Sequence, residues 1–112
     1  MPFQNITGNK LGQAAIPTAV AVLYTVPTNT RSFIKNIDIA NNTGAPIQVT
    51  VYLVPAGGSP DPLGNVLIPN MTVPLYGVLQ WTGSQIITDG DTIQMVASAV
   101  GCTINVSGGE AV

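Results

Sequence analysis

Hydrophobic and polar residues alternate with a period of two along most of this chain. The clearest run is residues 47–53, where every second residue is Ile, Val or Leu and those between are Gln, Thr and Tyr. Residues 93–97 and 102–106 show the same alternation. Successive side chains of a β-strand point to opposite faces of a sheet, so this pattern predicts half-buried strands. No apolar positions recur with a helical period over comparable lengths.

Turn-forming residues divide the chain into short segments. Asn41-Asn42-Thr43-Gly44 and Thr88-Asp89-Gly90-Asp91 are typical of tight turns, and residues 55–64 form a longer loop rich in Gly and Pro. Gly and Pro are spread along the whole length, so no linker separates two domains. We therefore expect an all-β fold, an antiparallel β-sandwich or small jelly roll of about seven to nine short strands.

The apolar face of each expected strand supplies the core. In the strand that begins near Arg31, one face is expected to carry Phe33, Ile37 and Ile39, with Lys35 interrupting the alternation. The full predicted core is Val22, Phe33, Ile37, Ile39, Val49, Val51, Leu53, Ile93, Met95, Ile104 and Val106.

The first residues are patterned more loosely than the rest. We expect residues 1–18 to form an extended N-terminal arm and residues 19–112 to form the single sandwich domain. The arm carries three apolar side chains, Phe3, Ile6 and Leu11, between Gly and Pro residues. These three are the candidate contacts with a neighbouring subunit or with a shell beneath it, through strand addition or by filling apolar pockets. The sandwich is expected to fold without the arm.

The charge content points to a protein that works in an assembly. Only 7% of the 112 residues are charged, against a usual share of roughly 25%. A surface this poor in charge is unusual for a free, solvated monomer. With three basic residues and a net charge of −2, a nucleic-acid partner is not expected. No membrane span and no signal peptide are expected either, because no long apolar run and no basic segment followed by an apolar one occur.

The residue types that carry most enzyme chemistry are scarce. The chain has no His, which removes the commonest general base and metal ligand. Its single cysteine, Cys102, forms no internal disulfide or multi-thiolate site and is read as a small buried hydrophobe. We therefore expect no enzyme and no catalytic, cofactor-binding or metal site.

The remaining candidate sites have simpler structural interpretations. Asp89 and Asp91 flank Gly90 and suit a calcium site or a carboxylate pair, but the same residues suit a tight turn. Trp81 suits a sugar-binding platform, and also the filling of a core or interface. The basic residues Lys10, Arg31 and Lys35 suit contact with an anion, and also a solvated face or a salt bridge to Asp38 or to a partner subunit. Four Asn-x-Ser/Thr sequons are explained by the composition.

A resemblance to a known group of proteins covers most of the chain. Several segments resemble a pattern common in small virion proteins of tailed bacteriophages: Leu23–Pro27, Thr30–Arg31, Ile37–Thr43, Val49–Gly57, Gly90–Ile93 and Ile104–Glu110. The resemblance implies an all-β virion component of the capsid decoration or cement type, which binds an assembled shell and staples neighbouring subunits. It implies a homo-oligomer that contacts the major capsid protein or another virion protein, in particles assembled in the host cytoplasm. It supplies no site residues.

Two other functions stay open. A tail, neck or fibre component of a phage has the same pattern. A carbohydrate-binding or host-adhesion module would need an exposed aromatic platform, for which Trp81 is the strongest candidate.

Overall fold

The protein is an all-β sandwich in the computed structural model, which describes residues 6–61 and 63–111, apart from the side chains of Ile6, Thr7 and Asn9. No helix occurs in these residues. The strands are β1 (Ile6–Ala15), β2 (Ala21–Thr25), β3 (Arg31–Asn41), β4 (Ile47–Val54), β5 (Val66–Val73), β6 (Val78–Thr88), β7 (Thr92–Ala97) and β8 (Cys102–Ala111). The expected fold class is thus confirmed, with eight strands in the described residues.

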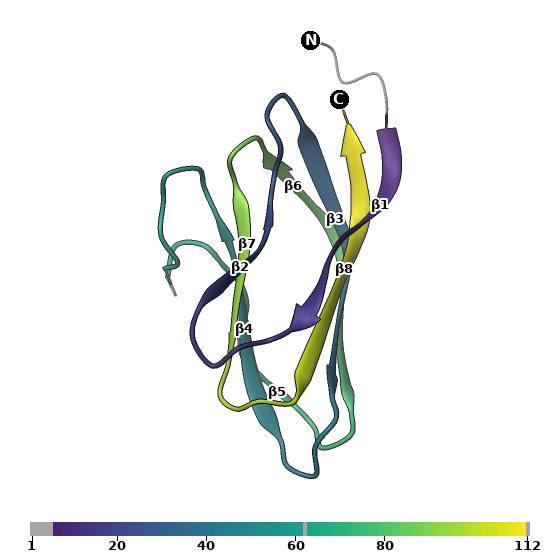
Figure 1. The fold of residues 1–112 in the computed structure, drawn as a ribbon, viewed down its shortest axis with the longest axis vertical. Coiled ribbons are helices and arrows are strands. Elements are labelled where there is room, and N and C mark those ends of the chain that lie inside the picture. Colours follow the sequence, from purple (N-terminus) through teal and green to yellow (C-terminus); the bar gives the residue numbers. More distant parts are fainter. Residues whose placement is uncertain (1–5, 62, 112) are drawn as a thin grey trace.

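The strands form two four-stranded antiparallel sheets that face each other (Figure 1). The first sheet has the order β1-β8-β3-β6 and the second has the order β2-β7-β4-β5. The chain changes sheet at every connection except the one between β4 and β5. Two four-stranded sheets wound in this way are a jelly roll.

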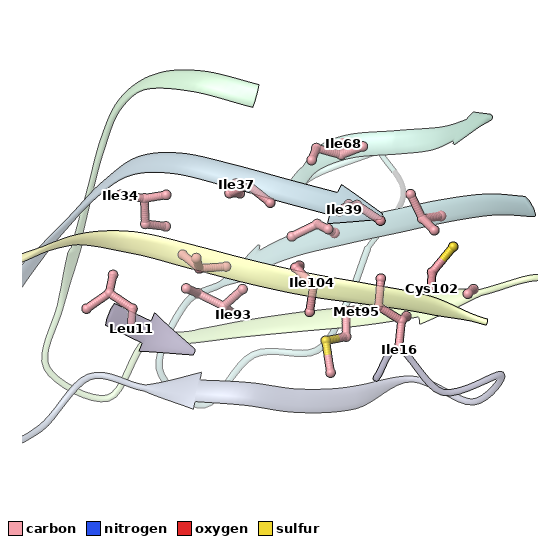
Figure 2. Packing of buried hydrophobic residues seen from close by; sticks show 14 of the residues in the cluster. Leu11, Ile16, Ile34, Ile37, Ile39, Ile68, Ile93, Met95, Cys102 and Ile104 are labelled. Atoms are coloured by element: carbon pink, nitrogen blue, oxygen red, sulfur yellow. The ribbon is translucent and has the colours of Figure 1, made fainter. Parts of the chain in front are cut away.

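The core lies between the two sheets and is built mainly from aliphatic side chains (Figure 2). The structure buries eight of the residues predicted from the alternation: Ile37, Ile39, Val49, Val51, Ile93, Met95, Ile104 and Val106. Each comes from a strand with a neighbour on both sides, namely β3, β4, β7 or β8. In these inner strands the period of two therefore identified the buried face correctly.

The prediction for Phe33 is wrong because β3 contains a bulge. The register of β3 shifts between Ile34 and Asn36 in its pairings with both β6 and β8, which leaves Lys35 as the irregular residue. Ser32 and Ile34 consequently point into the core and are fully buried, whereas Phe33 is only partly buried. One extra residue reverses which positions face inward on the two sides of a bulge.

Two further core predictions fail or hold only in part. Val22 is 53% exposed, because β2 shifts register between Val22 and Tyr24 and instead directs Leu23 and Tyr24 toward the core. Leu53 is partly buried and packs against the core, and its neighbour Val54 is buried. Both deviations occur where the pairing of a strand is irregular or ends.

The N-terminal segment belongs to the sandwich rather than to a separate arm. β1 pairs antiparallel with β8 from Ile6 opposite Ala111 to Ala15 opposite Thr103. Leu11 is 6% exposed and Ile16 2% exposed, both within the common core. The predicted arm is therefore wrong for residues 6–16, because pairing with β8 satisfies the backbone and burial of Leu11 fills the core. Phe3 and the side chain of Ile6 lie outside the described residues.

Candidate interaction surface

Two edge strands of the sandwich, β5 and β6, carry no charged residue. All eight charged residues lie outside residues 62–88, a segment bounded by Asp61 and Asp89. This segment contains β5 and β6, which are edge strands of different sheets, and the turn Pro74–Gly77 between them. We call β5, β6 and this turn the uncharged side.

β6 is a long and open sheet edge. It spans 11 residues and pairs only with β3, so the backbone groups on its other side have no strand partner among the described residues. Leu79, Trp81 and Ile87 pack inward, while the alternate positions are exposed. Folded proteins usually protect such an edge with charges, Pro or a short length. β6 has none of these three features, and its one irregularity is a shift of its register with β3 between Thr82 and Gln85.

The other sheet edges are protected. β5 is interrupted by Pro69 and by Asn70, whose φ is 39°. β1 carries Lys10, and β2 is only five residues long. β6 is therefore the edge best suited to pairing with another strand.

Large exposed hydrophobic side chains gather in the uncharged segment. Nine such residues occur in the described part of the chain, and six of them lie in this segment: Leu63, Met71, Leu75, Tyr76, Val78 and Ile86. Single exposed apolar residues are ordinary on protein surfaces, but several in one uncharged region indicate a contact surface.

A shallow apolar groove lies between the two edge strands of this side. It has a volume of about 180 Å³ and is lined by Leu67, Ile68 and Pro69 of β5 and by Leu79 and Trp81 of β6. The indole of Trp81 also lies over Gly83, where an added Cβ would approach the ring to 3.1 Å. Trp81 is thus partly buried and packed on the core, not displayed as a flat sugar platform.

On the opposite side of the sandwich, a side chain of β2 packs closely against β1. There Leu23 of β2 lies against Gly12 of β1, so close that a Cβ on Gly12 would be 2.6 Å from the Leu23 Cγ. The glycine makes room for the leucine between the two sheets. Leu23 thus fills the space beside Gly12 on this side, whereas a groove lies between β5 and β6 on the other.

The turn between β5 and β6 contains an unfavourable backbone conformation. Tyr76 has a φ of 48°, a region that Gly or Asn normally occupies, and its side chain is 70% exposed. The turn is held by hydrogen bonds from the Gly77 amide to the Pro74 carbonyl and from the Tyr76 amide to the Thr43 carbonyl. The turn thus exposes an aromatic ring on a residue whose backbone conformation is unfavourable in free energy.

Three polar side chains meet between the sheets, away from the uncharged side. Tyr24 of β2 donates a hydrogen bond to Glu110 of β8 and also bonds with the buried Ser32 of β3, at 2.7 Å. Burial, and then the hydrogen bond to Glu110, raise the pKa of Tyr24 to about 12. This cluster satisfies buried polar groups and connects the two sheets.

The acidic turn has the structural role that was favoured from the sequence. Asp91 accepts hydrogen bonds from the backbone amides of Thr88 and Ala56, both at 2.9 Å, and Gly90 has a φ of 85°. Asp89 is exposed. No group of three or more His, Cys, Asp or Glu residues among those described is arranged to hold a metal ion.

The remaining sequence candidates are separate from one another. Lys10 donates a hydrogen bond to Gln13 along the edge strand β1, while Arg31 and Lys35 lie on β3. Cys102 is buried, and burial raises the pKa of its thiol. Leu11, one of the candidate subunit contacts, is taken up by the core of its own sandwich. The uncharged side was not among the sequence candidates, although the spacing between Asp61 and Asp89 was a visible signal for it.

Comparisons with known proteins show the fold and no family. No protein-family model matches the chain, and no curated protein matches its sequence. A chain from Bacillus endospore appendages, described as a novel family of disulfide-linked pili, is similar with a TM-score of 0.53 and 13% identity, over 95% of this chain and 87% of that one. A chain of infectious bursal disease virus, Gx strain, has a TM-score of 0.49 and 11% identity, and the match spans 32% of its length. No helix able to cross a membrane occurs in the described residues.

Proposed function

We propose that this chain is a structural subunit that acts by assembly, and more specifically that it decorates and cements the capsid shell of a tailed bacteriophage. The observation that carries the proposal is the uncharged side, with its open 11-residue edge strand and its exposed apolar side chains. Such a surface costs little to desolvate and offers backbone groups for strand pairing.

Two further observations support an assembly role. The fold is similar to that of a chain from Bacillus endospore appendages, which are described as pili. Many copies of one weak contact add up when subunits are held on a common lattice. In this chain the only cysteine is buried, so the proposed contacts between subunits are non-covalent.

The location in a particle is tested by counting copies. Particles that contain this chain would be purified, and its abundance relative to the major shell protein would be measured by quantitative mass spectrometry. Hundreds of copies spread over the shell support decoration. A few copies at one vertex would assign it to the tail or neck instead, and absence from particles would refute a virion role.

The contact surface is tested by placing charge on the uncharged side. Val78→Lys and Ile86→Lys should weaken self-association and incorporation into particles, because each places a charge among exposed apolar residues. Val100→Lys is the matched control, since Val100 is also exposed but lies outside this side. Equal behaviour of all three variants would contradict the proposed surface.

A further inference from the structure

The groove between β5 and β6 has the size and chemistry to take one aromatic ring. Its volume is about 180 Å³, and a cavity of about 150 Å³ lined by apolar side chains is enough to bind benzene. Its lining includes the indole of Trp81 and the side chain of Met71, which is 45% exposed. An indole and a methionine sulfur both make favourable contacts with a further aromatic ring. The described residues that line the groove carry no charge, so an apolar occupant fits it best.

Phe3 is the occupant that this chain itself offers. It belongs to a segment of nine residues before Lys10 that contains no charged side chain. The chain has two phenylalanines, and the other one, Phe33, is partly buried on β3. Phe3 lies outside the described residues, which begin at Ile6. An uncharged segment with a phenyl ring matches an uncharged groove of this volume, because no charge has to be desolvated when the two meet.

Phe3 is too far from the groove of its own chain to fill it. Through β8 and β3, the pairings place Ile6 level with Thr88, on the opposite edge of the same sheet. Trp81 is roughly 20 Å from Thr88 along β6, and β6 is about 14 Å from β1 across the sheet. Phe3 precedes Ile6 by three residues, which gives a reach of about 11 Å. If Phe3 fills a groove, it therefore fills that of another copy.

We propose that Phe3 of one copy of this chain docks in the groove between β5 and β6 of a second copy. This inference rests on the proposed function, because it names what the uncharged side binds. The groove residues Leu79 and Trp81 lie in the part of β6 before its register shift, where the outer backbone edge has no strand partner among the described residues. The segment that carries Phe3 can therefore add backbone hydrogen bonds to this edge.

The proposed contact joins two different surfaces of the subunit. The segment with Phe3 leads into β1, at one edge of its sheet, whereas the groove is lined by β6 at the other edge and by β5. Each copy can thus give one segment and receive another, which makes the contact heterologous. Contacts of this type continue from copy to copy, into a ring or an open row. This outcome suits a subunit that acts in many copies.

Variants of each partner test the contact. Phe3→Asp alters the segment, and Met71→Asp alters the groove at an exposed side chain. Each should weaken self-association at least about tenfold in sedimentation experiments, with an unchanged circular dichroism spectrum. Gln4→Asp is the matched control, because it places the same charge on the neighbouring residue, and it should weaken association much less. Met71→Gln makes the comparison without a charge if Met71→Asp fails to fold.

Two results of these measurements would overturn the proposal. Equal effects of Phe3→Asp and Gln4→Asp would show that the phenyl ring is not the docking group. Normal association of Phe3→Asp, together with weak association of Met71→Asp, would show that the groove receives another part of the neighbouring copy.

Mixing the two variants tests the direction of the contact. Phe3→Asp keeps an intact groove and Met71→Asp keeps an intact segment, so one contact can form between unlike copies. The mixture should therefore recover association and stop at pairs. If the unmodified chain self-associates but the mixture of folded variants does not recover, this docking is wrong while the assembly role stands. If the unmodified chain does not self-associate in particles or in solution, the assembly role fails as well.

Discussion

The phenolic hydroxyl of Tyr24, on β2, donates a hydrogen bond of 2.5 Å to the carboxylate of Glu110, on β8. The two residues are 86 positions apart in the sequence and belong to different sheets. Ser32 of β3 bonds with the same hydroxyl. The cluster therefore connects the second strand to the last one across the sandwich, through partly buried groups.

Tyr24→Phe should lower the free energy of unfolding by about 1–3 kcal/mol, because it leaves the Glu110 carboxylate and the buried Ser32 hydroxyl without this partner. Chemical denaturation followed by circular dichroism measures the change. Tyr76→Phe is the control, since it removes the same hydroxyl from a residue that is 70% exposed. Equal stability of the two variants would contradict a structural role for the cluster.

The same cluster predicts a loss of stability at alkaline pH. The pKa of Tyr24 is raised from 10.0 to about 12 in the folded protein, so the folded state holds this proton more tightly than the unfolded state. The contribution to stability is complete below pH 10 and is lost as pH rises through about 12. The free energy of unfolding, measured by denaturation curves at a series of pH values, should depend less on pH over this range in Tyr24→Phe than in the unmodified protein. An unchanged pH dependence in that variant would count against the assignment.

Substitutions at two isoleucines should distinguish effects on folding stability from effects on self-association. Ile37→Ala should cost about 2–5 kcal/mol of folding stability, because Ile37 is fully buried and its removal leaves a cavity. Ile86→Ala should leave folding almost unchanged and weaken self-association, because Ile86 is 58% exposed on the uncharged side. Thermal unfolding and sedimentation distinguish the two effects. A strongly destabilised Ile86→Ala protein would show that this side chain serves the fold instead.

The period-two alternation located the buried faces of the inner strands but not the residues at register shifts. In β4, β7 and β8 each buried residue lies between neighbours on both sides, so a strict period of two fixes the face. The sequence around Lys35 contains no Gly or Pro to announce a bulge, and the alternation of Phe33 with Ile37 was extended through it. Bulges depend on pairing with neighbouring strands, which a single segment does not reveal.

Deleting residues 2–12 should destabilise the sandwich, because β1 pairs with β8 and Leu11 lies in the core. Leu11→Ala alone should cost about 2–5 kcal/mol. Both changes are measured by thermal unfolding, with Gln13→Ala on the same strand as the exposed control. An unaltered melting temperature in the truncated chain would instead support the separate N-terminal arm that the loose pattern of residues 1–18 predicts.

Tyr76→Asn should raise the stability of the isolated chain by about 1 kcal/mol, since Asn adopts a positive φ more easily than Tyr. The neighbouring exposed residue provides the control Leu75→Asn, which relieves no positive φ and should not be stabilising. Differential scanning calorimetry makes the comparison. If Tyr76→Asn also impairs incorporation into particles, the strained turn is retained for its exposed ring. A lower melting temperature for Tyr76→Asn would contradict the strain.

The candidate surface was only partly accessible from sequence. The low charge content led to assembly as a hypothesis, and the uncharged interval between Asp61 and Asp89 marks the segment concerned. That this interval supplies two edge strands on the same grooved side follows from the order of strands in the two sheets. Strand order is a long-range property, and the same short strands fit many orders. The Tyr24–Glu110 link was invisible for the same reason.

The packing of Leu23 against Gly12 makes the two sides of the sandwich different. The side with β1 and β2 carries Lys10 and the packed Leu23, whereas the side with β5 and β6 carries a groove and no charged residue. A subunit that associates through the uncharged side would then turn β1 and β2 away from that contact, toward solvent or another component of the particle.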